Sequence, residues 1–232
     1  MTTKKPALIG ATEAETVVIS APNFGVMELI IQGTAPLVIE RFSVKADLMM
    51  KMAQEAAPAT KKVRKPRDYE QEAENARYRA EDEGWEGMNA AAFRAGMISA
   101  CRLANFKMTI AKLSLFIKAD GADTHDGIPL TRIYGPSRTF TAHTRNATGV
   151  VDIRSRPQYR QWAAKVPVMF DRTQFSATDV INLFTRVGMQ VGIGAGRPDS
   201  KSSAGCGWGT FEIVTAKDEA LVCKSFGISR RA

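Results

Sequence analysis

Cysteine and histidine are scarce in this chain of 232 residues, which has three cysteines and two histidines. Cys101, Cys206 and Cys223 form no CxxC pair and no cluster with histidine. This pattern excludes a disulfide framework and a structural zinc site of the usual spacing. An odd and scattered set of cysteines is typical of a reducing compartment.

Long apolar runs are also missing. No stretch approaches the 18 or so apolar residues that span a bilayer, and the first five residues lead into no apolar signal-peptide segment. We therefore expect a cytoplasmic protein with no membrane partner.

Catalytic motifs are few. His125 and His143 stand in no metal-binding spacing, and GxSxG, GxxxxGK[ST] and a strand-to-helix GxGxxG are absent. The acidic run at 81–86 lacks the alternation of a calcium loop. We expect that the protein is not an enzyme and has no cofactor. A ribonuclease with His143 as general base is less favoured than a nucleic-acid binder or a protein–protein module.

Basic charge is abundant, with 32 Lys and Arg against 24 Asp and Glu, a formal net charge of +8 and a pI near 9.5. This balance favours polyanions, nucleic acid first. Hydrophobic residues make up 44%, so the chain is long enough and apolar enough for a real core.

Periodicity predicts an α+β fold in which helices pack on an antiparallel sheet. Residues 1–14 are expected to be a disordered tail, and 15–232 a single domain with a charged insertion at 57–86. The predicted strands lie at 25–32, 36–42, 161–171 and 208–214, and the predicted helices at 44–57, 89–105 and 177–189. Residues 107–153 are predicted to form short strands and loops. Pro167 suggests an edge strand or a bulge, and Gly188 a helix C-cap.

The charged insertion joins two blocks of opposite sign. Its basic half carries Lys61, Lys62, Arg64, Lys65 and Arg67, and eight acids follow between 68 and 86. The insertion is either a solvated segment whose halves partly neutralise each other, which we favour, or a basic finger that grips a nucleic-acid backbone or a neighbouring subunit.

A glycine-dense loop at 192–209 follows the second helix. It holds six glycines, among them Gly194, together with Arg197 and Lys201. Glycines allow positive φ and close approach of another backbone, so the loop either presents N–H groups and cations to phosphates or serves only as a long excursion between elements.

Between 145 and 165 basic residues are interleaved with two aromatic residues, Tyr159 and Trp162. If 150–160 is extended, Arg154 and Arg156 project from one face, and Arg145 and Arg160 lie nearby. Guanidinium groups and aromatic rings are what a single strand needs for its phosphates and bases. Trp162 is either such a ring or, as its alternation favours, a core residue.

The strings DIRSRPQYRQW, NLFTRVGMQVGIGAGRP and GWGTFEIV resemble a family of tailed-phage proteins, and FRAGMISACR is similar to that family's preceding helix. More distantly, a helix, a G-x-G … G-x-G loop and a terminal strand are similar to the RAMP superfamily, which includes the backbone subunits of CRISPR surveillance complexes. The matching loop positions are Gly192, Gly194, Gly205, Gly207 and Gly209, whereas Gly196 and the spacer PDSKSSA depart from the pattern.

The resemblance implies a ferredoxin-like or RNA-recognition-type fold with a basic insertion loop, whose copies polymerise along a single strand. The leading expectation is therefore non-enzymatic binding of single-stranded RNA or DNA by a homo-oligomer, in the bacterial host cytoplasm if the chain is phage-encoded. The alternative is a protein–protein module, such as a phage mimic of a surveillance-complex backbone subunit or a structural assembly protein.

Overall fold

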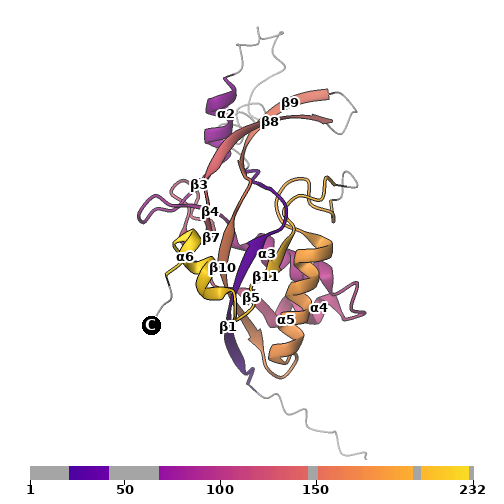
Figure 1. Ribbon diagram of the computed structural model, residues 1–232. Helices are drawn as coiled ribbons and strands as arrows, with labels where there is room; N and C mark the ends of the chain where they lie inside the picture. The colour runs from indigo at the N-terminus through magenta and orange to yellow at the C-terminus, as the bar shows by residue number, and fades with distance from the viewer. Residues whose placement is uncertain (1–20, 42–67, 146–150, 201–204, 230–232) are drawn as a thin grey trace, which may run out of the picture.

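The computed structural model describes residues 21–41, 68–145, 151–200 and 205–229. Helices and β-strands alternate irregularly along these ranges (Figure 1). In chain order they are β1 (Phe24–Gly33), β2 (Leu37–Val38), α2 (Tyr69–Asn75), β3 (Tyr78–Arg79), β4 (Glu86–Asn89), α3 (Ala90–Ala100), α4 (Met108–Ser114), β5 (Leu115–Ile117), β6 (Gly121–Ala122), β7 (Pro129–Tyr134), β8 (Ser137–Arg145), β9 (Val151–Tyr159), β10 (Ala163–Asp171), α5 (Ala177–Arg186), η1 (Val187–Val191), β11 (Phe211–Ile213) and α6 (Glu219–Phe226).

The main sheet is antiparallel and runs in the order β11-β1-β10-β7-β4-β3, with β5 also paired to β10 and β6 to β7. Its longest pairing joins β1 to β10 over nine residue pairs, from Phe24 opposite Asp171 to Gln32 opposite Ala163. The α+β class and the mostly antiparallel sheet are thus confirmed.

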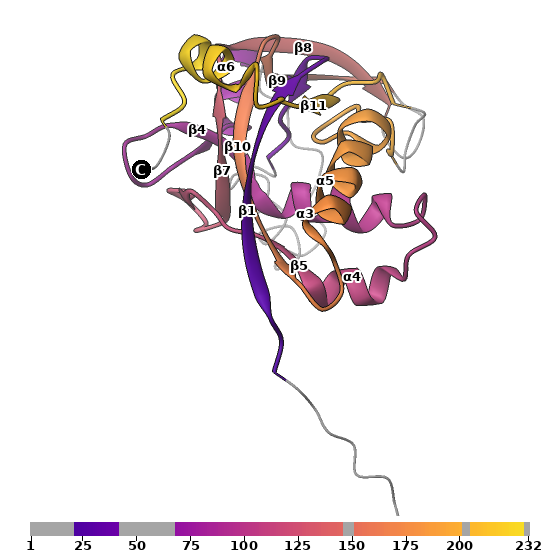
Figure 2. The same ribbon diagram turned by 60° about the horizontal axis from the view of Figure 1, so that its bottom comes forward.

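Helices α3, α4 and α5 gather on one side of β1 and β10 (Figures 1 and 2). An aromatic cluster holds α3 and α5 to the sheet: the ring of Phe184 lies 5.3 Å from that of Phe211 and 6.3 Å from that of Phe93, measured between centroids. Trp162 adds an edge contact to Phe211 at 6.1 Å and is fully buried. Trp162 is therefore a core residue.

Helix α6 covers part of the opposite face of the sheet. Val222, Cys223 and Ile228 form a smaller apolar cluster there with Ala163 of β10. Strand β10 is consequently buried on both faces over most of its length.

A second sheet, in the order β2-β9-β8, extends beyond the end of β1 that lies away from the N-terminus (Figure 1). Strands β8 and β9 form a hairpin joined by nine residue pairs, and α2 lies against it. Residues 68–86, the acidic half of the charged segment, form α2, β3 and the start of β4, so this part of the segment is built into the two sheets.

The strands expected at 25–32 and 208–214 correspond to β1 and β11, and three further expected elements also agree with the structure. The strand at 161–171 is β10, the helix at 89–105 is α3, and the helix after Ser176 is α5, whose first turn carries a capping box between Ser176 and Asp179. These elements carry strong period-2 or period-3.6 patterns in the sequence.

The expectation for Pro167 is wrong, because β10 is an interior strand. One neighbour, β7, pairs with Ala163 and Ala164, and the other, β5, pairs with 168–170. Pro167 stands where the pairing with β5 ends. Its carbonyl accepts a hydrogen bond from the N–H of Lys118, but proline has no N–H to donate in return, so the ladder with β5 stops at this residue.

The C-cap expectation for Gly188 is also wrong. The α5 helix continues into the π-helical turn η1, and the left-handed residue that ends it is Gly192, with φ of 68°. Gly188 is buried inside the turn, where a Cβ would overlap the carbonyl oxygen of Phe211. Its role is to let the turn pass close to β11.

Helix α4 replaces one of the strands and loops expected at 107–153. Its buried positions, Ala111 and Ser114, are small and three residues apart, so the packing face is too narrow to show in the hydrophobic pattern. The guanidinium of Arg94 donates to the carbonyls of Lys112 and Leu115 and so satisfies the end of the helix from outside.

A buried ion pair ties the end of β2 to the turn before β7. Arg41 Nη2 lies 2.7 Å from Asp123 Oδ2 and 3.2 Å from Asp126 Oδ2, and the Arg41 and Asp123 side chains are 4% and 0% exposed. Asp123 also accepts from the N–H groups of Arg79 and His125. Removing the Asp123 charge would leave the buried guanidinium of Arg41 with only the partly exposed Asp126 as its counter-charge, at the longer distance.

We therefore expect Asp123→Asn to lower the free energy of unfolding by about 3 kcal/mol. The control is Asp126→Asn, which changes the same charge at a side chain that is 33% exposed and should cost less than about 1 kcal/mol. Urea unfolding followed by circular dichroism measures both, and equal losses would contradict the assignment of the buried charge to Asp123.

Candidate nucleic-acid interface

The β8–β9 hairpin brings basic side chains to one face. In its register Arg138 pairs with Gln158, Phe140 with Arg156 and Ala142 with Arg154, and residues paired in this way share a face. We call the set Arg138, Phe140, Arg154, Arg156 and Gln158 the arginine face. The expectation that Arg154 and Arg156 project together is met.

Glu40 lies against both arginines. Its Oε1 contacts Arg156 Nη2 and lies 3.7 Å from Arg154 Nη1. Arg154 is 43% exposed and Arg156 15%. Burial lowers the pKa of Arg156, and the negative charge of Glu40 acts in the opposite direction. Glu40 thus supplies one negative charge to two guanidinium groups and holds them in place.

Arg138 is anchored at the other end of the arginine face. Its Nε and Nη2 both donate to Gln158 Oε1, at 3.0 and 2.6 Å. Gln158 is buried and Arg138 is exposed. The amide therefore fixes a guanidinium that remains open to solvent.

The opposite face of the hairpin is buried in the core at the root of the hairpin and lies against α2 further out. Tyr159 is 1% exposed, and its hydroxyl donates to Glu86, which also accepts from Arg77 at 2.8 Å. Thr139 on the same face donates to Glu70 of α2 at 2.7 Å. Tyr159 is therefore unavailable to a nucleobase, although its place among arginines made it a candidate for stacking.

The glycine-dense loop lies beside the arginine face. The ring of Phe140 meets that of Trp208 edge-on at 5.4 Å, and both residues are half-buried. Two backbone hydrogen bonds fasten the loop to the β2 region, from Ala195 N–H to Val38 and from Gly209 N–H to Pro36, at 2.9 and 2.8 Å. Hairpin and loop thus border one surface.

All six loop glycines have positive φ, which confirms why glycine is needed there. Several of the loop N–H groups are occupied by the protein itself: Ile193 donates to Gly209, and both Cys206 and Trp208 donate to Gly196. Those groups do not face a phosphate. Of the two roles open to the loop, an excursion held by its own backbone accounts for these bonds.

Two side chains anchor the loop further. Arg197 Nη1 donates to the carbonyl of Gly194 at 3.1 Å, within the loop. Asp199 accepts from Ser99 and from Arg102 at the end of α3, and these hydrogen bonds, that of Ser99 first, lower the pKa of Asp199. The loop is therefore tied to a helix as well as to β2.

The remaining predicted residues are not gathered with the arginine face. Arg160 is exposed on the link between β9 and β10, and Arg145 ends β8, its side chain beyond the described part. Outside the described residues lie Lys61, Lys62, Arg64, Lys65, Arg67 and Lys201, together with the tail expected at 1–14 and the helix expected at 44–57.

Sequence reasoning missed Glu40, Arg138, Phe140 and Trp208. The alternation in SRTFTAHTR is the signal for β8, but which of its faces meets Arg154 and Arg156 depends on the hairpin register. The contact between Phe140 and Trp208 joins residues far apart in the chain and leaves no local pattern.

His125 and His143 are both exposed. Within the described ranges no three His, Cys, Asp or Glu side chains are grouped to hold a metal ion, and no helix there has the length and apolar character to cross a membrane. Comparison with known proteins finds no matching family model and no similar curated protein.

The close approach of the loop backbone can be tested at two glycines with the same φ. A Cβ at Gly209 would overlap Ile193, whereas one at Gly207 would meet nothing within 4 Å. In both Ala variants the left-handed backbone conformation costs about 1 kcal/mol. Only Gly209→Ala adds the overlap with Ile193, so it should lose clearly more stability than Gly207→Ala. Unfolding in urea gives the comparison, and similar losses would show that contact at Gly209 is unimportant.

Glu86 predicts a pH dependence of stability. Burial raises the pKa of Glu86, but hydrogen bonds from Tyr159 and Ser137 and the charge of Arg77 outweigh it, so the pKa lies below the ordinary 4.5. A carboxyl with a lowered folded pKa stabilises the fold above its unfolded pKa and loses that contribution as pH falls through the folded pKa.

We expect Glu86→Gln to flatten the acid limb of the stability curve below pH 4.5, and the exposed Glu81→Gln to leave it unchanged. Urea midpoints measured across this range test the effect. An acid limb of unaltered steepness in Glu86→Gln would refute it.

Proposed function

We propose that this protein binds single-stranded nucleic acid without catalysing a reaction, on the surface bordered by the arginine face and the glycine-dense loop. The observation that carries the proposal is the projection of Arg154 and Arg156 from one face of β9 onto a single carboxylate, Glu40. A phosphate that replaces Glu40 would meet two guanidinium groups already positioned to receive it.

The surroundings support a single strand as ligand. Phe140 and Trp208 are half-buried rings beside the arginines and are suited to stack on unpaired bases. The net charge of +8 supplies the long-range attraction. RNA and DNA are both within the proposal, and comparing their affinities distinguishes them.

The proposal includes the ferredoxin-like, RNA-recognition-type arrangement that the resemblance implies. The chain order β1, α3, β5, β10, α5, β11 together with the sheet order β11-β1-β10-β5 supports it. The likeness to the RAMP superfamily and to tailed-phage proteins, and a place in the bacterial cytoplasm, belong to the same proposal.

Assembly along the strand is a further part of the proposal. Among the described residues β11 pairs with β1 only from Ile31 to Gly33, so the edge of β1 from Phe24 to Glu28 has no strand beside it. Phe24 and Val26 are 39% and 50% exposed on this edge. An open strand edge with apolar side chains is suited to contact another chain.

The same edge favours the second candidate, a protein–protein module such as a mimic of a surveillance-complex backbone subunit or an assembly protein. Affinity separates the two: a nucleic-acid binder loses affinity steeply as salt rises, whereas a contact through the apolar edge of β1 does not.

The test uses variants in which a charged side chain is replaced by a neutral amide. Loss of the arginines and loss of Glu40 should change the affinity in opposite directions. The double change Arg154→Gln, Arg156→Gln should weaken binding of a fluorescent oligonucleotide at least roughly tenfold and reduce the slope of log affinity against log salt by about 0.7 per lost phosphate contact. Glu40→Gln removes the competing carboxylate and should strengthen binding.

The matched control is Arg186→Gln, which removes one positive charge from an exposed site on α5, away from the hairpin. Circular dichroism and melting verify folding of all variants. Folded double variants with wild-type affinity and salt slope would overturn the proposal, as would weaker binding by Glu40→Gln.

A further inference from the structure

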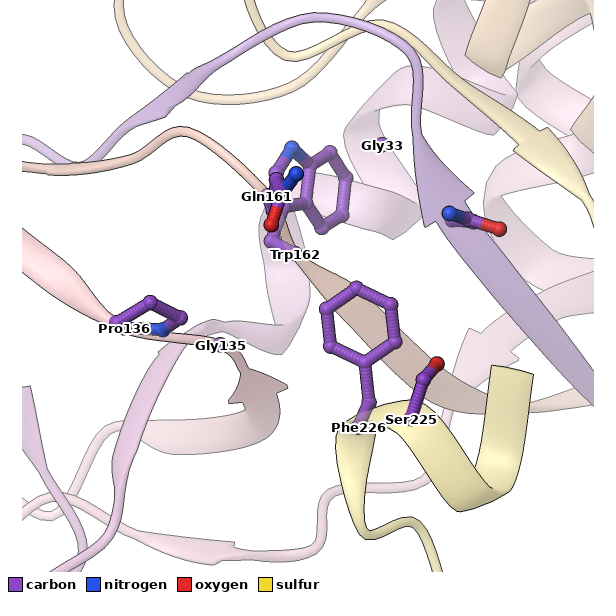
Figure 3. Close-up of a pocket in the computed structure, with 8 residues that line it drawn as sticks. Gly33, Gly135, Pro136, Gln161, Trp162, Ser225 and Phe226 are labelled. Atoms are coloured by element: carbon purple, nitrogen blue, oxygen red, sulfur yellow. The ribbon is translucent and has the colours of Figure 1, made fainter. Parts of the chain in front are cut away.

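A pocket of about 410 Å³ lies at the root of the hairpin, between α6, the end of β1 and the two links that join the hairpin to the main sheet. Figure 3 shows Phe226 projecting from α6 toward the link that carries Gln161 and Trp162, with Ser225 beside it on the same helix. A pocket of this size is at the small end of the range for ligand sites and suits a single ring system.

Three kinds of group line the pocket. Phe226 is a half-buried ring, Gln32 and Gln161 are amides that both donate and accept hydrogen bonds, and Ser225 is an exposed hydroxyl. Trp162 forms a fixed wall, because it is fully buried and its indole N–H donates to the carbonyl of Ala35 at 2.9 Å. This combination of aromatic ring and amides fits a flat heterocycle with a polar edge.

The two links pass close to each other at the edge of the pocket. Gly135 has φ of 133°, and a Cβ there would overlap the carbonyl oxygen of Gln161. The link between β7 and β8 can therefore pass close to the link between β9 and β10 only with glycine at this position. Packing of Phe226 against the apolar cluster of α6 sets the third side.

The pocket continues the line of the arginine face. Pro136 and Arg160 lie one residue beyond the last pair of the hairpin, Ser137 with Tyr159, next to the pair of Arg138 and Gln158 in the arginine face. Pro136 lines the pocket, and Arg160 precedes Gln161 and is exposed. A strand whose phosphates lie on the arginine face is thus led toward the pocket.

We propose that this pocket accepts one nucleobase, unstacked from the bound strand, with its ring against Phe226 and its polar edge hydrogen-bonded by Gln161 and Gln32. The inference rests on the proposed function, since it names where that same ligand is read. Single-stranded recognition commonly stacks a splayed base on an aromatic ring and bonds its edge to side-chain amides.

The experiment compares two oligonucleotides of equal length and charge, one complete and one with abasic positions, with wild type and with Phe226→Leu. Wild type should bind the complete oligonucleotide roughly tenfold more tightly, because a stacked base is lost in the other. Phe226→Leu keeps an apolar side chain on α6 and should abolish most of this difference while leaving affinity for the abasic oligonucleotide unchanged.

A second variant, Gln161→Ala, changes an exposed side chain and should alter the relative affinities for homopolymers of the four bases. Leu221→Ala, exposed on α6 outside the pocket, and Gln174→Ala, an exposed amide elsewhere, are the matched controls. Both should behave as wild type.

The outcomes separate the two proposals. A base-dependent difference that survives in Phe226→Leu, with homopolymer preference unchanged in Gln161→Ala, overturns the base pocket and leaves the arginine face standing. If wild type binds neither oligonucleotide, the proposed function fails, and titration with the four nucleoside monophosphates decides the pocket: saturable binding lost in Phe226→Leu supports it, and no binding overturns it.

Discussion

The candidate interface depends on close contacts between backbone segments that leave no room for a side chain. Gly209 lies against Ile193, Gly194 against Val38 and Gly188 against Phe211, each too closely for a Cβ. These approaches bring the loop onto β2 and β11 and allow the bonds from Ala195 and Gly209 to form. Without them the loop would not border the hairpin, and Trp208 would not reach Phe140.

The loop is held in this position by the core on its other side. Gly188 lies in the π-helical turn that follows α5, and the aromatic cluster of Phe93, Phe184 and Phe211 fixes α5 and β11 relative to each other. Because the loop begins at the end of that turn and ends at β11, the core determines both of its ends. The surface that we assign to the ligand therefore rests on this aromatic cluster of the core.

Sequence patterns predicted those elements whose own residues show a clear period or a capping motif. The alternation from Trp162 to Phe170 and the capping box at Ser176 carry β10 and α5 almost to their ends. Patterns failed where a distant contact decides the local structure. Pro167 is interior because its two neighbours, β5 and β7, divide β10 between them, and Gly188 continues a helix because β11 passes beside it.

The same distinction applies to the candidate site. Alternation within 150–160 was enough to place Arg154 and Arg156 on one face, since that property belongs to a single strand. Glu40, Arg138 and Phe140 join them through pairing with β2 and β8, which depends on register. Tyr159 shows the converse, because its aromatic ring among arginines suggested stacking, whereas its alternation places it with the core-facing set.

The positions of the arginine face and the pocket set the size of the ligand that uses both. From Arg154 to Arg160 a strand advances roughly 20 Å. At the spacing of about 3.4 Å per nucleotide in a stacked strand, this length corresponds to about six phosphates. A mononucleotide can therefore occupy the pocket or the arginines but not both, and the affinity of a strand should rise with length until it spans them. The charge of Glu40 between the arginines adds a reason for this dependence, because a single phosphate must displace a carboxylate that is already in place. In a strand whose base is bound in the pocket, the phosphates are held near the arginines. Their effective concentration is then set by the strand itself, and they compete better with Glu40.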